Sequence, residues 1–534
     1  MDAPDRAGTP QSVTPRPVLP LWAALIAALA SAGLLNLAFP ATSVWIAAFP
    51  AAALLLLALI GRRTWAALLV GFVYGAAFFL VLVSWTARYL GPVPWLALGL
   101  FEGALTAVAL IPVTLAYRWV PRFVRPRGLR IVVLALTQAA LWIGRELFLG
   151  NWPYGGFPWP RIAYTLADTP MARVTSWIGI SGLGFLMVLL VALVLELIRS
   201  GGLRIGVARG GRRLLPLALS AGIVIVLAVA PAFPTSANGT MRIGAVQGNG
   251  PTGYFDQRAP LAVLNAQAAA TEPLFGKRMD LLVWPEGGLD ADPFQYPALS
   301  DALDEISDRV GAPILANAAT QKGDLFFNTS FLWPRSPHGT LARDDVQTHS
   351  KRHPVPFGEY VPDRPFFNAI VPDLIGLIGR EYTPGSDVPV VRVGDTPVGL
   401  AICFDVIYDE VIAEGVGEGA QVLVFQTNNA DFRGTVENLQ QLAIARMRAV
   451  ETGRSVVNIS TIGTSQVIRP DGSTQATLKS DHPGALLEDV ELRTGVTAGV
   501  ILGPWIEQVL LWGGLIVVAG SGLLAGVRRP RAAG

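Results

Sequence analysis

The chain has 534 residues, of which 52% are hydrophobic and only 15% are charged, and its mean hydropathy is +0.46. Soluble globular domains carry about 25% charged residues, so a large part of this chain is expected to lie in lipid. The formal net charge of +2 argues against a nucleic-acid partner.

Apolar stretches of roughly membrane-spanning length dominate the first part of the chain. Seven occur before residue 235, at about 19–39, 43–61, 65–87, 94–117, 129–149, 174–198 and 214–233, and one more lies at about 507–526. The pattern predicts an eight-helix transmembrane bundle (7+1) with a polar domain inserted before the last helix. The expected divisions are a cytoplasmic tail (1–17), seven transmembrane helices (18–234), an extracytoplasmic domain (235–505), an eighth helix (506–527) and a cytoplasmic tail (528–534).

The first span has a second interpretation as a cleaved signal peptide, because Ala30-Ser31-Ala32 resembles a small-residue cleavage site. The apolar run continues to Phe39, however, and a Pro-rich polar tail precedes it instead of a short basic one. These features favour a retained helix, and cleavage would leave the orientation of the later spans unchanged.

Basic residues indicate the orientation of the helices. The alternate loops are poor in them: the first has none and the third has only Arg88. Arginines gather in the other loops and after the last span, at Arg62, Arg63, Arg118, Arg122, Arg125, Arg127, Arg130, Arg199, Arg204, Arg209, Arg212, Arg213, Arg528, Arg529 and Arg531. Cytoplasmic loops carry the excess of Lys and Arg, so the clustered side is the cytoplasm and residues 235–505 are expected outside.

The end of the fifth span carries unusual polar and aromatic residues. Arg145 and Glu146 lie close to its outer end, where they could pair with each other or hold the loop that follows. That loop, 150–159, is rich in aromatic residues, Gly and Pro. It fits either an interfacial aromatic belt or a structured floor beneath the outer domain.

From Met241 onward, short β-branched runs alternate with helical stretches, which indicates a layered α/β domain. Asp471-Gly472 predicts a hairpin turn near its end. The expected strands are 241–246, 281–284, 313–316, 390–393, 398–402, 422–426 and 456–459, and the expected helices include 260–274, 299–310 and 436–452.

Cys403 is the single cysteine of the chain and follows the predicted strand 398–402. It cannot form an internal disulfide, so it is either a small buried hydrophobic residue or a reactive thiol.

Two further segments could supply chemistry to that thiol. Glu286 follows a predicted strand that ends in proline, and Lys351 and Glu359 stand eight residues apart around a proline-stiffened stretch. A thiol attacking a carbonyl needs a base and a donor for the oxyanion, and a glutamate and a lysine can fill these roles if they meet the cysteine. Taken singly, Glu286 could cap a helix and Lys351 could be a solvated charge.

Together and in this order, Glu286, Lys351 and Cys403 resemble the Glu-Lys-Cys triad of the nitrilase (carbon–nitrogen hydrolase) superfamily, which has an α-β-β-α sandwich fold. With its spans before and after the domain, the chain resembles the apolipoprotein N-acyltransferase family of that superfamily. The motifs that carry this resemblance are Pro356-Phe357-Gly358-Glu359-Tyr360, Gly156-Phe157-Pro158-Trp159, Val246-Gln247-Gly248-Asn249 and Ala445-Arg446-Met447-Arg448-Ala449-Val450-Glu451.

The resemblance implies that Glu286 is the general base, Cys403 the nucleophile and Lys351 the oxyanion stabiliser, with Glu359 positioning Lys351 or shuttling a proton. The implied reaction is ping-pong: Cys403 takes a fatty acyl chain from a phospholipid and passes it to the α-amino group of a diacylglyceryl-cysteine at a lipoprotein N-terminus. Glu286 would be a poor base for a thiol unless burial raises its pKa. We expect a monomer in the bacterial plasma membrane that needs no cofactor or metal.

The chain departs from the family pattern at two places. Phe404-Asp405 stands where many members have Tyr-Glu, which leaves open whether these residues support catalysis or contact a lipid head group. A tryptophan often found early in the domain has no counterpart, and the nearest aromatic residues are Tyr254 and Phe255.

Residues 364–379 form an apolar segment with helix breakers that is too short to span a membrane. It is either a buried core segment or a mobile arm on the membrane that gates lipid access to Cys403, and we favour the arm. His349 and His353 have a four-residue spacing, but Pro354 and Pro356 break helical presentation and no third metal ligand is evident.

Two other functions remain open from the residues alone. A membrane-tethered amidase or nitrilase would use the same triad and transfer its acyl group to water. A transporter or receptor would use the outer domain only to bind a ligand, but the scarcity of charge within the spans argues against it.

Overall fold

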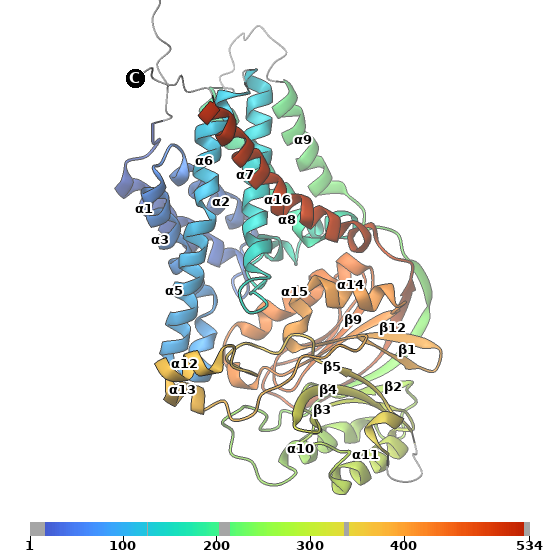
Figure 1. The fold of residues 1–534 in the computed structure, drawn as a ribbon. Coiled ribbons are helices and arrows are strands. Elements are labelled where there is room, and N and C mark those ends of the chain that lie inside the picture. Colours follow the sequence, from blue (N-terminus) through green and yellow to red (C-terminus); the bar gives the residue numbers. More distant parts are fainter. Residues whose placement is uncertain (1–15, 125, 202–213, 336–340, 528–534) are drawn as a thin grey trace, which may run out of the picture.

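A computed structural model describes residues 16–124, 126–201, 214–335 and 341–527. The described chain has two parts, a bundle of long helices and a β-sandwich flanked by shorter helices (Figure 1). The final helix returns from the sandwich to the bundle, where the N-terminal helices also lie.

The bundle agrees with most of the predicted spans. Within the described residues, six helical segments are long and apolar enough to cross a membrane, while the segments Trp45–Leu59 and Leu214–Val229 are shorter. The protein is therefore a multi-pass membrane protein. The bundle helices are α1 (Leu21–Ala38), α2 (Ala48–Leu59), α3 (Thr64–Leu82), α5 (Pro92–Ala109), α6 (Ile111–Trp119), α7 (Arg127–Leu149), α8 (Thr175–Arg199), α9 (Leu214–Val229) and α16 (Ala498–Val527), with the short α4 (Ala87–Leu90) before α5.

Several spans differ in detail from the prediction. The span expected at 94–117 consists of α5 and α6, which meet at Leu110, two residues before Pro112. Proline lacks a backbone N–H and commonly interrupts helical hydrogen bonding. Helix α16 begins at Ala498, well before the expected 507. Among the arginines used for orientation, Arg125, Arg204, Arg209, Arg212, Arg213, Arg528, Arg529 and Arg531 lie outside the described residues, as do most of the first tail and all of the last.

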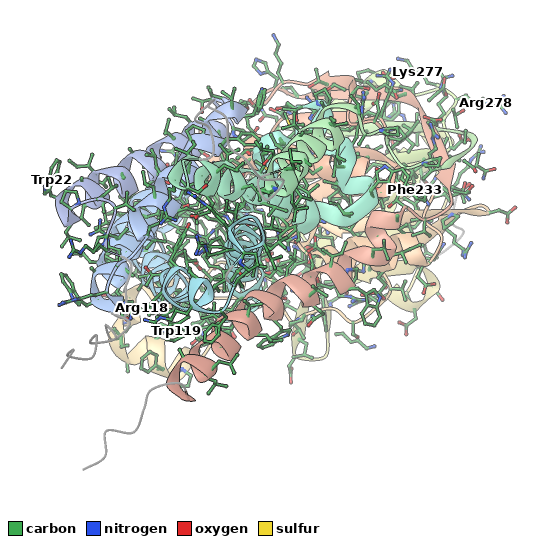
Figure 2. All side chains as sticks on the ribbon, turned by 90° about the horizontal axis from the view of Figure 1, so that it is seen from above. Trp22, Arg118, Trp119, Phe233, Lys277 and Arg278 are labelled. Carbon is green, nitrogen blue, oxygen red and sulfur yellow. The ribbon has the colours of Figure 1, made fainter. Side chains whose placement is uncertain are left out.

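The outer surface of the bundle is apolar. Trp22 of α1 is 67% exposed and lies at the rim in the view from above (Figure 2), and Val509 and Ile516 of α16 are similarly exposed. Lys277 and Arg278 lie at the opposite end of this view, on the sandwich. An exposed apolar surface of this extent is typical of helices that face lipid.

Two sheets, each with six strands among the described residues, form the sandwich. The first has the order β12-β1-β2-β3-β4-β5 and the second the order β11-β10-β9-β8-β7-β6. The strands are β1 (Ser236–Gln247), β2 (Leu281–Val283), β3 (Ile314–Lys322), β4 (Leu325–Trp333), β5 (Gln347–Ser350), β6 (Val390–Val393), β7 (Thr396–Ile402), β8 (Val422–Thr427), β9 (Ser455–Ser460), β10 (Ser465–Ile468), β11 (Thr474–Leu478) and β12 (Gly484–Thr494). The hairpin turn predicted at Asp471-Gly472 joins β10 to β11.

Alternation of side chains along the strands separates the layers. Val422 and Val424 of β8 pack between the sheets, whereas Leu423 and Phe425 of the same strand face the helices outside. Helices α10 (Ala262–Thr271) and α11 (Pro297–Val310) cover the first sheet, and α14 (Asp409–Gly417) and α15 (Glu437–Thr452) cover the second. The domain is thus an α-β-β-α sandwich, as expected of a nitrilase-like fold.

The second helix layer also joins the membrane bundle. The apolar cluster that contains α14 and α15 is continuous with the core of the bundle helices, and Figure 1 shows these two helices between the sheets and the bundle. Because the domain packs on the bundle through α14 and α15, the second sheet, which includes β7, is the sheet closer to the membrane half.

Candidate active site

Cys403 begins a tight turn directly after β7. Its backbone φ is +49°, in the left-handed region that residues other than glycine rarely adopt, and the turn continues as a short 3₁₀ segment to Ile407. Strain of this kind persists where the surroundings over-determine it, commonly at functional sites. The thiol is partly buried, and the Gln441 side-chain amide donates a hydrogen bond to Sγ at 3.7 Å.

Glu286, Lys351 and Glu359 form a buried ionic cluster, which we call the reaction cluster. Lys351 Nζ lies 3.3 Å from Glu286 Oε1 and 2.8 Å from Glu359 Oε2. Glu286 follows β2 and Lys351 follows β5, so two strand ends of the first sheet deliver the opposing charges. Cys403 lies close enough to Glu286 for the two groups to shift each other's pKa, which brings the end of β7 in the second sheet to this cluster.

Asn328 of β4 orients the two carboxylates. Its Nδ2 donates to Glu286 Oε1 at 2.7 Å and to Glu359 Oε1 at 3.2 Å, while its Oδ1 accepts from Asn317. Sequence reasoning missed this residue because β4 was not predicted. The polar run Asn328-Thr329-Ser330, within an otherwise apolar strand, was the available signal.

Burial controls the protonation of these groups. Desolvation raises the pKa of Glu286, although Lys351 opposes the rise, and desolvation followed by repulsion from Glu286 raises the pKa of the Cys403 thiol well above its usual value. For Lys351, burial lowers the pKa, but the attraction of Glu286 and Glu359 prevails and holds it well above the usual value. The resting site therefore contains a neutral thiol beside a strengthened base and a fixed ammonium.

Asp405 lies inside the protein, against the segment that follows Lys351. Its carboxylate accepts the backbone N–H groups of Arg352 at 3.1 Å and His353 at 2.8 Å. These contacts tie residues 403–407, which we call the Cys403 turn, to the segment that follows Lys351. The structure thus places Asp405, one of the two unusual residues of this chain, among protein groups instead of at a head-group surface.

Phe404 contacts the membrane half. Its ring stacks on Phe157 of the loop 150–159 with centroids 6.2 Å apart, and Trp159 of that loop donates through Nε1 to Gln440 Oε1 at 2.8 Å. Trp159 is almost fully buried, whereas Trp152 is 53% exposed. The part of the loop with Phe157 and Trp159 therefore packs against the Cys403 turn, whereas Trp152 faces outward.

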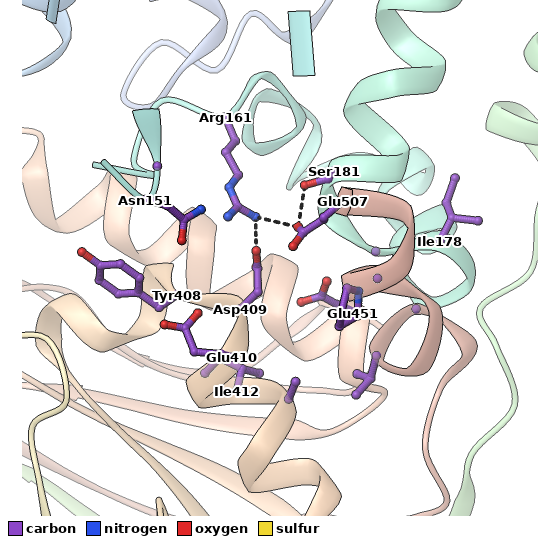
Figure 3. Close-up of a pocket in the computed structure, with 17 residues that line it drawn as sticks. Asn151, Arg161, Ile178, Ser181, Tyr408, Asp409, Glu410, Ile412, Glu451 and Glu507 are labelled. Carbon is purple, nitrogen blue, oxygen red and sulfur yellow. Dashed lines mark hydrogen bonds and ion pairs between the residues drawn. The ribbon is translucent and has the colours of Figure 1, made fainter. Parts of the chain in front are cut away.

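A second buried ionic cluster joins the Cys403 turn to the bundle, and we call it the joint cluster (Figure 3). Arg448 of α15 donates to the carbonyls of Val406 and Ile407, both at 2.9 Å, and pairs with Asp409 at 2.6 Å. Asp409 in turn lies 2.6 Å from Arg161 of the membrane half. Its pKa is held below the usual value because the two arginines outweigh the effect of burial.

The joint cluster extends into two bundle helices. Arg161 lies 3.8 Å from Glu507 of α16, which accepts from Ser181 of α8 at 2.8 Å. Helix α8 is interrupted at Gly179, where φ is +72°. The helix resumes at Ile180, whose backbone N–H donates to the Glu451 carboxylate of α15 at 3.2 Å. A side-chain carboxylate at the N-terminus of a helical segment is a favourable cap. These partners account for Arg448 and Glu451 in the motif 445–451.

At the end of α7, Arg145 pairs with Glu146 at 3.3 Å, and Glu146 also accepts from Trp142 and from the backbone N–H of Ile162. Both arrangements considered from the sequence, mutual pairing and support of the loop that follows, are therefore present.

Residues 364–379 form two short helices, α12 (Arg364–Ile370) and α13 (Pro372–Gly376), which we call the arm. Ile375 and Ile378 pack in a small cluster of their own, separate from the cores of the domain, while Phe366 and Ile370 are about 60% exposed. The interpretation of the arm as part of the domain core is therefore wrong. The Tyr254 hydroxyl donates to the arm carbonyl of Leu377 at 2.9 Å.

The two histidines considered as metal ligands have different partners. His349 Nδ1 lies 3.3 Å from Asp387, and His353 Nε2 lies 2.9 Å from Glu410. Within the described ranges, no group of three or more His, Cys, Asp or Glu side chains is arranged to hold a metal ion.

A sandwich of two mixed sheets, with Glu286, Lys351 and Cys403 placed after strand ends, fits the resemblance to the carbon–nitrogen hydrolase superfamily. In agreement, the sequence profile of the carbon-nitrogen hydrolase family matches residues 242–496. The profile described as the apolipoprotein N-acyltransferase N-terminal domain matches residues 31–193 in the bundle. The chain belongs to the apolipoprotein N-acyltransferase family and is an acyltransferase.

Curated relatives cover most of the chain. It is 29% identical to the apolipoprotein N-acyltransferase of Mycolicibacterium smegmatis, over 86% of this chain and 78% of that protein. It is 26% identical to the one from Vibrio vulnificus, over 91% of this chain and 94% of that protein. A solved CN-hydrolase superfamily protein of Xanthomonas campestris, with an arsenic adduct in its active site, matches 51% of this chain and 97% of its own at 17% identity and a TM-score of 0.34.

Proposed function

We propose that the protein transfers a fatty acyl chain from a membrane phospholipid to the α-amino group of an N-terminal diacylglyceryl-cysteine of a lipoprotein, through a thioester on Cys403. The observation that carries the proposal is the buried reaction cluster beside the chain's single cysteine. The contact of Phe404 with Phe157 of the membrane half adds a reason for lipid substrates.

In the first half-reaction, Glu286 accepts the thiol proton as Sγ attacks the ester carbonyl of the phospholipid. The raised pKa of the thiol means that little thiolate exists beforehand, so proton removal and attack occur together. Lys351 stabilises the negative oxygen of the tetrahedral intermediate. The ester C–O bond then breaks, and Glu286 returns the proton to the departing lysophospholipid hydroxyl.

In the second half-reaction, the acceptor amine attacks the thioester carbonyl. Glu286 accepts a proton from the amine and gives it to the sulfur as the C–S bond breaks, which restores the thiol and releases the amide. Glu359, fixed by Asn328 and by the Val355 N–H at 2.7 Å, keeps Lys351 in place during both steps.

The proposed donor is a membrane lipid and the proposed acceptor carries a lipid anchor, which gives a reason to hold this domain on a helical bundle. By the distribution of arginines, the catalytic domain faces the extracytoplasmic side of the bacterial plasma membrane. The arm gates lipid access to Cys403 in this proposal, because its exposed Phe366 and Ile370 suit contact with acyl chains. Hydrogen exchange as slow in the arm as in β7 and β8 would argue against gating.

The test is a two-step assay with the purified full-length protein in phospholipid vesicles. Addition of a diacylglyceryl lipopeptide should yield the triacylated lipopeptide and lysophospholipid in equal amounts. A membrane-tethered amidase, the alternative function, would release free fatty acid whether or not the lipopeptide is present. Absence of any acyl product would contradict both enzymes and favour a binding protein.

A further inference from the structure

Gln441 of α15 lies at the nucleophile, although it belongs to none of the three sequence segments proposed to supply chemistry. Its side chain is almost fully buried, and its Nε2 donates to Cys403 Sγ at 3.7 Å. An N–H donor at a cysteine sulfur stabilises the thiolate more than the thiol, because hydrogen bonds to charged acceptors are the stronger ones.

A chain of hydrogen bonds fixes which end of the Gln441 amide faces the sulfur. It begins at Ser460, whose Oγ accepts the backbone N–H groups of Gly463 at 2.8 Å and Ile462 at 3.3 Å. Because backbone N–H groups can only donate, the Ser460 hydroxyl must give its proton elsewhere, and it donates to Asn429 Oδ1 at 2.6 Å.

The orientation of the Asn429 amide in turn fixes the orientation of the Gln441 amide. With Oδ1 of Asn429 occupied as an acceptor, its Nδ2 faces Gln441 Oε1 at 3.0 Å and Glu437 Oε2 at 2.7 Å. The Gln441 oxygen is thereby engaged, which leaves its Nε2 to face Cys403. The backbone of Gly463 lies very close to Asn429 in this arrangement, because a Cβ at Gly463 would be 2.2 Å from Asn429 Oδ1.

We propose that Gln441 is a further catalytic residue, whose amide N–H stabilises the Cys403 thiolate as it forms during attack and as it leaves the thioester. Asn429 and Ser460 are positioning residues that act through it. Lys351 is held between two carboxylates in the reaction cluster, so Gln441 supplies the hydrogen bond to sulfur that this ammonium does not make in the resting site. The inference rests on Cys403 being the nucleophile.

Cys403 is the only cysteine, so alkylation of the intact protein by iodoacetamide reports on this thiol alone. In Gln441→Met, which keeps the length but removes the donor, the apparent thiol pKa should rise and alkylation at fixed pH should slow by roughly tenfold to a hundredfold. Single-turnover acylation by phospholipid should slow similarly. In Asn429→Ala the same changes should be smaller, because Gln441 keeps its donor but loses its orientation.

Gln440→Met is the matched control, because the adjacent Gln440 accepts hydrogen bonds from the indoles of Trp85 and Trp159 and makes no hydrogen bond to the Cys403 thiol among the described residues. It should lower thermal stability without moving the thiol titration. Gln441→Glu keeps the shape and replaces the donor by a carboxylate, so it should raise the thiol pKa even where Gln441→Met is poorly folded. Unchanged alkylation profiles in both Gln441 variants would overturn the proposal. Normal alkylation without acylation in the unaltered protein would instead contradict the proposed function.

Discussion

Two buried ionic clusters lie around one turn in the described part of the protein, and they differ in the cation at their centre. In the joint cluster, the planar guanidinium of Arg448 donates to two carbonyls and two carboxylates. In the reaction cluster, the compact ammonium of Lys351 pairs with Glu286 and Glu359 beside a partly accessible thiol. Arg forms rigid, directional contacts and Lys is an adaptable point charge. Buried charge alone therefore does not identify a reactive site.

The first way to test this comparison is to remove the nucleophile. Cys403→Ala should abolish acyl transfer, because no other cysteine exists to carry the acyl chain. Unfolding temperature should change little, since only one sulfur is lost from a partly buried position. Transfer assays and thermal unfolding of the purified variant check both expectations, and transfer at the unaltered rate would contradict the mechanism.

Removing the base should have the next largest effect. Glu286→Gln keeps the shape and the capacity to accept from Asn328, but it cannot accept the thiol proton, so acylation should slow by roughly 10²–10⁴-fold. Single-turnover acylation measures this loss. A reduction of less than about threefold would mean that another group accepts the proton.

Breaking the joint cluster should lower the free energy of unfolding more than it lowers the rate of acyl transfer. Arg448→Met leaves buried carboxylates and carbonyls without their donor, so it should cost about 3–5 kcal/mol of unfolding free energy. Arg242→Met, which loses only an exposed pair with Asp489, is the control and should cost ~1 kcal/mol or less. Denaturant unfolding in detergent compares the two, and equal losses would remove the distinction drawn for Arg448.

Sequence reasoning identified β2, β7, β8 and β9 because their runs are apolar and buried, and it identified the partly buried β6 from its three valines. It missed β4 and β5, and β10–β12 at the end of the domain, where polar residues interrupt the alternation. Antiparallel strands with one more exposed face give a weaker signal than buried parallel ones.

The site was predictable only where a motif marks it. Glu286, Lys351, Glu359 and Cys403 occur in motifs, but Asn328 and Gln441 reach the site through sheet register and helix phase, which spacing along the chain does not reveal. Asp405 shows the same limit: its identity was noted as unusual, and only the structure places it against the backbone of Arg352 and His353.

A pH profile sharpens the comparison further. Burial raises the pKa of Glu286, so its active, deprotonated form is lost at a higher pH than for an exposed glutamate. The rate of acylation should therefore fall as pH decreases through this raised pKa and should be retained above it. The residual activity of Glu286→Gln should lack this acidic limb, and persistence of the limb would assign it to another group.

The smallest effect is expected at the arm. Tyr154→Phe removes the hydrogen bond of 2.8 Å from its hydroxyl to Asp363, an exposed contact worth about 1 kcal/mol at most. Hydrogen exchange within 364–379 should accelerate severalfold while exchange in β7 and β8 stays unchanged. Uniform acceleration in all three segments would show that the contact stabilises the whole domain instead.

The most direct test of the account is the intact mass of the protein after one exposure to phospholipid without acceptor. We predict one acyl group per protein, bound to Cys403 in place of the thiol hydrogen, with one lysophospholipid released. Hydroxylamine should remove this group, as expected for a thioester, and Cys403→Ala should not acquire it. An adduct on any other residue, or acyl transfer by a protein that never acquires the added mass, would contradict a covalent mechanism at this cysteine.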